Sequence, residues 1–230
     1  MMVESPSYAR QAYNVEINEL ERDLLDMGSR AEQMVGQAVD ALCSLDAELA
    51  HVVMLRDDEI DERDLAIESR CLRLLALQQP MAGDLRVVGT AMKMITDIER
   101  VGDLAVDIAK IALKVEKEFG QTGFIDIPMM AKVARTMFHE ALEAYVHRDL
   151  SRVQEVCERD EEVDALYREL RTQIFANMRA NPDQVVSDGW LLLAIHHVER
   201  IADHAVNIAE RVNFMVTGEF KQLSKKVENS

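Results

Sequence analysis

The sequence predicts an all-α protein made of two copies of one three-helix unit. The 230 residues include only 9 Gly and 4 Pro, and only 5% are aromatic, so turn formers and typical strand residues are both scarce. Apolar residues recur three and four positions apart over long stretches, which is the spacing of one helix face. The second half of the chain then repeats the pattern of the first.

The first unit is expected to contain three helices. The first covers residues 15–43, where the apolar residues keep to one face. Asp46 is suited to cap a second helix that runs to about residue 79. The segment 79–83 ends that helix, because its proline lacks a backbone donor and its glycine loosens the chain. The third helix is expected over residues 84–119.

The second unit follows a linker at residues 120–128, which holds two glycines and a proline. Its helices are expected at residues 129–147, 150–180 and 184–217. The polar segment after residue 217 is expected to fray. These limits place a first three-helix bundle at residues 8–119 and a second at residues 129–219.

The two units align residue by residue. Residues 95–109 match residues 195–209 at an offset of 100, and residues 56–61 match residues 159–164 at an offset of 103. The difference of three residues falls in the loop between helices, where changes of length cost least. The pattern therefore indicates a duplicated domain.

Both units place carboxylates four residues apart on two different helices. Residues at this spacing lie above one another on a helix face, and like charges there destabilise a helix by roughly 0.2–0.5 kcal/mol. If the two helices pack side by side, their pairs converge into a cluster of four carboxylates that a cation would neutralise. The predicted metal ligands are Asp57, Asp61, Glu99 and Asp103 in the first unit and Asp160, Asp164, Glu199 and Asp203 in the second.

Oxygen-only ligand sets suit hard cations such as magnesium, manganese or iron. Asp107, His196 and Asn207 are candidate additional ligands, because they share the helix faces of the predicted ligands. Asn207 stands where the first unit has Asp107, so the two sites are expected to differ in affinity. The alternative interpretation is a solvated acidic face, with Arg100 and Arg200 as local partners. Retention of the pairs in two diverged copies favours metal binding.

Charge and composition narrow the function. A formal charge of −16 repels phosphate backbones and argues against direct nucleic acid binding. The three cysteines, Cys43, Cys71 and Cys157, stand singly in helical patterns and are expected to be reduced core residues. The N-terminal segment has no apolar run after a basic start, and no window is apolar enough to span a membrane. A cytoplasmic location is expected.

Catalytic motifs are missing from the sequence. It contains no phosphate-binding loop, no G-x-S-x-G and no H-E-x-x-H. Neither Glu99 nor Glu199 begins the Glu-x-x-His motif of di-iron bundles, since residues 102 and 202 are Gly and Ala. A non-enzymatic protein is therefore expected. The alternatives are a metal-dependent phosphate-ester hydrolase and a helical scaffold without metal.

The chain resembles the PhoU family of bacterial phosphate-signalling proteins. The features that carry the resemblance are E-R-[VI]-x-D-x-A-V-x-I-A at 99–109 and 199–209, R-D-x-E-[IV]-D at 56–61 and 159–164, and Q-P-M-A-x-D-L-R at 79–86. The resemblance covers about residues 10–218. It implies a fold of two pseudo-symmetric antiparallel three-helix bundles, and it implies that the acidic motifs hold iron or zinc in some members.

The resemblance also implies a function and partners. It implies a cytoplasmic negative regulator, peripheral to the inner face of the membrane through its partners, which links the phosphate ABC transporter Pst to the sensor kinase PhoR. A homodimer is the family expectation. The Q-P-M-A-x-D-L-R segment has no clear copy in the second half, so a contact made by one half only is expected there. The predicted partner-binding residues are Asp84, Arg86, Arg100 and Arg200.

Overall fold

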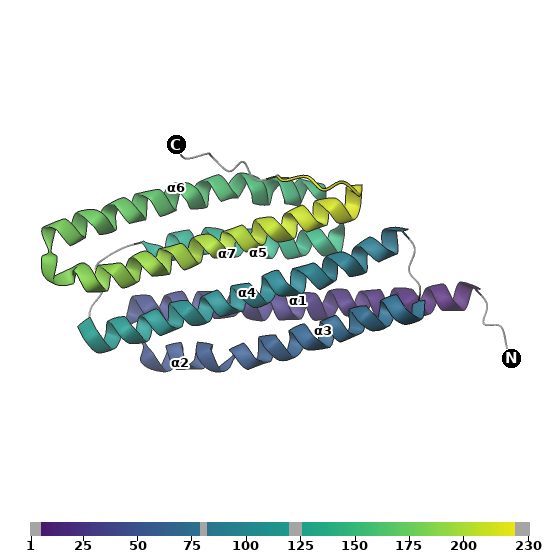
Figure 1. Ribbon diagram of the computed structural model, residues 1–230, viewed down its shortest axis with the longest axis horizontal. Helices are drawn as coiled ribbons and strands as arrows, with labels where there is room; N and C mark the ends of the chain where they lie inside the picture. Colours follow the sequence, from purple (N-terminus) through teal and green to yellow (C-terminus); the bar gives the residue numbers. More distant parts are fainter. Residues whose placement is uncertain (1–5, 79–81, 120–125, 224–230) are drawn as a thin grey trace.

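The protein is an all-α molecule of long helices that run along its longest axis (Figure 1). The computed structural model describes residues 6–78, 82–119 and 126–223. Its helices are α1 Pro6–Ser44, α2 Ala47–Leu55, α3 Asp57–Gln78, α4 Ala82–Phe119, α5 Ile127–His147, α6 Leu150–Ala180, the short 3₁₀ turn η1 Pro182–Gln184, and α7 Val185–Thr217. The all-α bundle fold predicted from the sequence is confirmed.

One predicted element is wrong. The single helix expected from residue 46 to residue 79 is interrupted at Arg56, which separates α2 from α3. The Arg56 amide donates to Val53 at 3.1 Å, and its carbonyl accepts from Glu59 at 3.1 Å, so tight turns replace the regular ladder. The Arg56 guanidinium donates to Gln37 at 3.0 Å, which ties the break to α1. Its counterpart α6 runs through without a break.

The duplication extends to the turns between helices. Leu45 and Arg148, 103 residues apart, both adopt left-handed backbone conformations, with φ of 54° and 56°. The amide that follows each of them reaches back to a carbonyl five residues earlier, as in a Schellman motif, at 3.0 and 3.1 Å. That following residue is Asp46 or Asp149, and its carboxylate caps the next helix.

The two bundles share one hydrophobic core. In Figure 1 helices α1–α4 form one layer and α5–α7 the other, with α3 and α6 at opposite edges. Helices α1 and α4 pack against α5 and α7, and the buried residues form one continuous cluster. Gly28 allows the close approach of α1 to α5, because a Cβ there would lie 2.3 Å from Cδ1 of Leu142. The two bundles therefore pack against each other as one body.

Polar contacts across α4 and α7 join the two bundles. Asp97 accepts from Asn207 at 3.2 Å, and its carboxylate lies 2.9 Å from Nδ1 of His204. Across the same pair of helices, the charge of Asp107 acts on His197. Because the two repeats are offset by 100 residues, His197 stands at the position equivalent to Asp97, and Asp107 at the position equivalent to Asn207. The contacts between α4 and α7 are thus repeated about an internal pseudo-two-fold axis.

The cysteines differ from the sequence expectation. Cys71 is buried, but Cys43 is exposed and Cys157 is half-buried, so only one of the three is a core residue. Within the described ranges, no helix has the length and apolar character needed to cross a membrane.

Candidate functional site

The first acidic cluster lies between α3 and α4. Burial, followed by the charges of Asp103 and Asp61, raises the pKa of Asp57. Burial and the nearby Asp103 and Asp61 also raise the pKa of Glu99. Asp57 on α3 is therefore affected by Asp103 on α4, and Glu99 on α4 by Asp61 on α3, as expected if the two i,i+4 pairs converge. Packing of α3 against α4 brings them together.

Two cations lie against this first cluster. Nη1 of Arg100 donates to Asp103 at 2.7 Å, and its Nε lies 3.4 Å from Glu99. Nζ of Lys110 lies 3.0 Å from Asp107 and lowers the pKa of Asp57 against the larger effects that raise it. Part of the first cluster's charge is thus neutralised by the protein itself.

The second acidic cluster lies between α6 and α7. Burial, followed by the charges of Asp164, Asp203 and Glu199, raises the pKa of Asp160 to about 6. Every group that shifts Asp160 raises its pKa, in contrast to Asp57, where Lys110 opposes the others. The Glu199 side chain is 26% exposed, close to the 25% of Glu99. The duplicated glutamates therefore hold equivalent half-buried positions.

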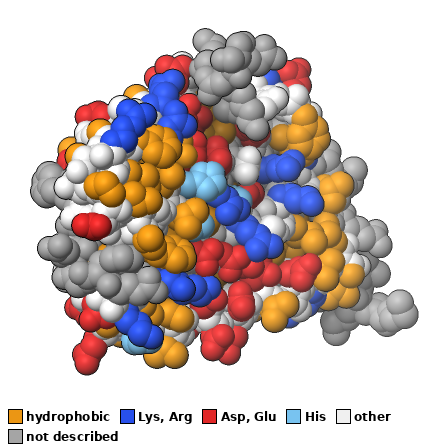
Figure 2. All heavy atoms as spheres, turned by 60° about the vertical axis from the view of Figure 1, so that its left-hand side comes forward, with side chains coloured by type: hydrophobic (Ala, Val, Ile, Leu, Met, Phe, Trp, Pro, Cys, Tyr) orange, Lys and Arg blue, Asp and Glu red, His pale blue; other side chains and the backbone are white. Residues whose placement is uncertain are grey.

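The surface beside each cluster is hollowed. A cavity of about 650 Å³ lies beside the second cluster and is lined by Asp160 and Asp164 among other residues. A more open hollow of about 410 Å³ beside the first includes Asp61 and Glu99. Figure 2 shows that acidic side chains on one face gather in a band bordered by Lys and Arg. The electrostatic potential on this face therefore varies between negative and positive regions, although the net charge of the chain is negative.

The donor chemistry of both clusters fits a hard cation. The predicted ligands are all carboxylates, and their mutual repulsion contributes to raised pKa values that a cation would reverse. Across residues 6–78, 82–119 and 126–223, no three His, Cys, Asp or Glu side chains are already drawn together closely enough to hold a metal ion. Metal binding therefore stays a prediction.

The three candidate additional ligands have separate environments. Nδ1 of His196 lies 2.9 Å from Glu199, so it belongs to the second cluster. Asp107 pairs with Lys110 beside the first cluster. Asn207 faces Asp97 in the joint between the bundles, so its amide is directed away from the second cluster.

The predicted partner-binding residues are also spread out. Nε of Arg86 donates to the backbone carbonyl of Met215 at 3.0 Å, so Arg86 connects the two bundles. The carbonyl of Asp84 accepts from Tyr13 at 3.4 Å. Arg100 and Arg200 are exposed at matching positions on α4 and α7. Of the four predicted partner-binding residues, these two arginines lie beside the acidic clusters.

Sequence reasoning missed two features of these sites. Asp64 raises the pKa of Glu99 and lines the adjacent hollow, and its position three residues after Asp61 could have revealed it. Lys221 and Leu223 line the cavity beside the second cluster. They lie in the segment that was expected to fray, where only Gly218 signalled a helix end.

These observations define the class of the protein: a duplicated all-α bundle with one acidic cluster per repeat. A sequence model described as the PhoU domain matches residues 24–112 and again residues 127–212, one match in each repeat. The chain belongs to the PhoU family.

Relatives match over nearly the whole length. A protein of Clostridium acetobutylicum named phosphate-specific transport system accessory protein PhoU homolog is 36% identical, covering 91% of this chain and 96% of its own. The Streptococcus pneumoniae protein of the same name is 33% identical, covering 94% of this chain and 100% of its own.

Solved structures agree. The crystal structure of PhoU from Pseudomonas aeruginosa has a TM-score of 0.84 at 33% identity, covering 90% of this chain and 100% of that one. PhoU from Streptococcus pneumoniae, titled a phosphate transport system regulatory protein, gives 0.83 at 33% identity, covering 91% of this chain and 99% of that one.

Proposed function

We propose that this chain is a non-enzymatic regulator of phosphate uptake that acts at the cytoplasmic face of the membrane. It couples a phosphate ABC transporter of the Pst type to a PhoR-type sensor kinase and lowers the starvation response when phosphate is plentiful. Support comes from family membership over nearly the whole chain, with relatives named as accessory proteins of phosphate transport.

The duplicated acidic cluster is the observation that carries a mechanism. Asp57, Asp61, Glu99 and Asp103 would hold a cation in the first repeat, and Asp160, Asp164, Glu199 and Asp203 in the second. Iron, zinc, manganese and magnesium are the candidates, and any of them would supply positive charge where carboxylates repel one another. Because the clusters lie at the surface between two helices of each repeat, a bound cation would convert an acidic patch into a docking surface for a partner.

Elemental analysis tests the metal sites. The full chain, purified without chelator, is compared with the variant Glu99→Ala, Asp103→Ala, Glu199→Ala, Asp203→Ala. We expect stoichiometric metal in the wild type and none in the variant. If both samples stay metal-free after incubation with Mg²⁺ or Mn²⁺, the clusters are not metal sites and the regulator works through its protein surface alone.

Partner binding tests the regulatory role separately. Pull-down of the transporter's ATPase subunit and of the cytoplasmic part of the kinase is compared before and after chelation, alongside the mass of the free protein, which should be that of a homodimer. Hydrolysis of a generic phosphate ester by the metal-loaded chain is measured in parallel. Turnover that depends on the acidic clusters would contradict the non-enzymatic role and would show that the chain is a hydrolase.

A further inference from the structure

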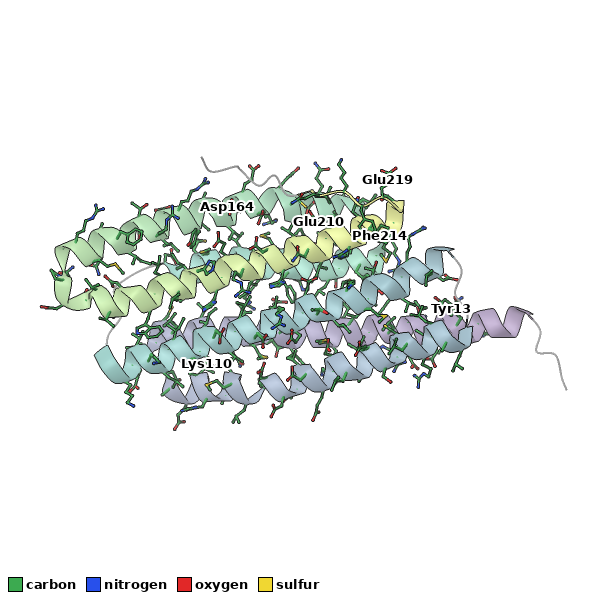
Figure 3. All side chains as sticks on the ribbon, in the orientation of Figure 1. Tyr13, Lys110, Asp164, Glu210, Phe214 and Glu219 are labelled. Carbon is green, nitrogen blue, oxygen red and sulfur yellow. The ribbon has the colours of Figure 1, made fainter. Side chains whose placement is uncertain are left out.

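The chain folds back on itself after α7. Gly218 takes a left-handed conformation with φ of 79° and ends the helix. Residues 218–223, which we name the C-terminal strap, then return along α7 (Figure 1). The Phe220 ring stacks on Phe214 with centroids 3.8 Å apart, and the Leu223 amide donates to Glu210 at 2.7 Å. Figure 3 shows Glu210, Phe214 and Glu219 along this end of the molecule.

The strap borders the cavity of about 650 Å³ beside the second acidic cluster. This volume is in the range of specific ligand sites. Apolar and acidic side chains of α6 line the cavity, together with one basic side chain of the same helix, Arg168. The apolar lining residues of α6 are Leu150, Val153 and Cys157, and the acidic ones are Glu158, Asp160, Glu161 and Asp164.

The strap contributes one basic and one apolar side chain to the cavity. Lys221 adds an ammonium group to a cavity lined by four carboxylates and the guanidinium of Arg168, and Leu223 adds an apolar side chain to the same lining. The strap is held lightly, because Phe220 remains 72% exposed despite its stacking. A segment that combines basic and apolar side chains therefore already lies at this site.

The first repeat is built differently at the corresponding position. At an offset of 103, the continuous wall of α6 corresponds to the end of α2, the break at Arg56 and the start of α3. Glu158 is matched there by Leu55, which is 76% exposed. The combination of carboxylates, apolar wall and strap belongs to the second repeat.

We propose that this cavity is the docking site for an extended segment of a partner protein that carries basic and apolar side chains, and that the strap occupies its edge as an internal mimic until the partner displaces it. The basic side chains of the partner meet the carboxylates of α6. Its apolar side chains replace Leu223 against Leu150, Val153 and Cys157. Because the partner has to displace the strap, only a segment that complements the charges and apolar side chains of the cavity binds there.

The probe is a synthetic peptide with the sequence Lys-Gln-Leu-Ser-Lys-Lys-Val, capped at both ends, and its control has glutamate in place of each lysine. Binding is measured to the full chain and to the full-length variant Phe220→Ala, Leu223→Asp, which releases the strap. Cys157 reports directly, because it lines the cavity; exposed Cys43 is the control thiol in the same chain. Alkylation of each cysteine is followed by mass spectrometry.

Chelator is present throughout, so the result does not depend on whether the clusters bind metal. We expect faster alkylation of Cys157 in the strap-released variant and protection by the lysine peptide but not by the glutamate peptide, with Cys43 unchanged. Affinity should rise about tenfold on strap release and fall about tenfold when Asp160→Asn and Asp164→Asn are added. The matched pair Asp57→Asn, Asp61→Asn should leave binding unchanged.

Three results would overturn the proposal. One is no protection of Cys157 by the peptide in the strap-released variant. Another is equal peptide affinity with and without the strap substitutions. The third combines two observations: Cys157 is alkylated faster in the full-length variant Lys225→Glu, Lys226→Glu, and the peptide has no effect on the strap-released variant. Together they would show that the C-terminal end of this chain occupies the cavity, and not a partner protein. Circular dichroism verifies that each variant keeps its helices.

Discussion

The two acidic clusters have matching carboxylates but different surroundings. In the first, Arg100 pairs with Asp103 and Lys110 with Asp107, so the repeat supplies its own counter-charges. In the second, burial and then the neighbouring carboxylates raise the pKa of Asp160 to about 6. Duplication therefore preserved the carboxylates while their electrostatic environment diverged. The second cluster should respond more strongly to an external cation, because the pKa of Asp160 is raised to about 6, whereas the rise at Asp57 is opposed by Lys110.

The largest expected effect is stabilisation by added cation. A ligand at one hundred times its Kd stabilises the folded state by about 2.7 kcal/mol. We expect Mn²⁺ to raise the Tm of the wild type, and the second-cluster variant Asp160→Asn, Asp164→Asn to lose more of this rise than the first-cluster variant Asp57→Asn, Asp61→Asn. Differential scanning calorimetry at pH 7, with and without EDTA, measures it. Equal losses in the two variants would remove the difference between the clusters.

A smaller effect concerns the charge of Asp160 without metal. Its folded pKa of about 6 lies above the unfolded value of about 3.9, so the folded state favours the protonated form. The resulting penalty is present in full above pH 6 and is relieved as the pH falls towards 4. Asp160→Asn should therefore stabilise the protein at pH 7 by about 1 kcal/mol once solvent screening is included.

Urea unfolding in EDTA at pH 7 and pH 5 measures this effect. At the lower pH, the free energy of unfolding of the wild type should come closer to that of Asp160→Asn. Burial lowers the pKa of His197, and protonation of this group works in the opposite direction, so the informative quantity is the difference between wild type and variant. A difference that does not shrink between pH 7 and pH 5 would contradict the assignment to Asp160.

The smallest expected effect concerns the arginine that is paired with the first cluster. Arg100→Ala removes the partner of Asp103 and Glu99. Because the arginine is 52% exposed, its loss should destabilise the protein by about 0.5 kcal/mol or less. Cation affinity of the first cluster should rise, as measured by Mn²⁺ titration. Arg200→Ala is the matched control at the aligned position, and a similar rise there would show a general charge effect.

Most of the architecture could be predicted from the sequence. Most helix limits and the repeat follow from apolar spacing and from direct alignment, although α1 begins at Pro6 and not at residue 15 as predicted. Even the half-buried position of Glu99 is shared by Glu199, and residues 91–100 and 191–200 have the same order of buried and exposed positions. The convergence of the carboxylates followed from placing them on neighbouring helices.

The differences between the repeats could not be predicted in the same way. The helical pattern continues through Arg56, and the break depends on contacts with α1 that are distant in sequence. The strap depends on the stacking of Phe220 upon Phe214, which exists only after the chain reverses. The contrast in pKa values depends on which cations fold back onto each cluster, and side-chain conformations decide that.

The contacts across α4 and α7 carry information about ancestry. In a symmetric dimer, if residue i of one subunit meets residue j of the other, then j also meets i. Asp97 with Asn207, and Asp107 with His197, follow this rule within one chain. The joint is therefore built like the interface of a homodimer whose two subunits were later fused into a single polypeptide, with each half still completing the hydrophobic interior of the other.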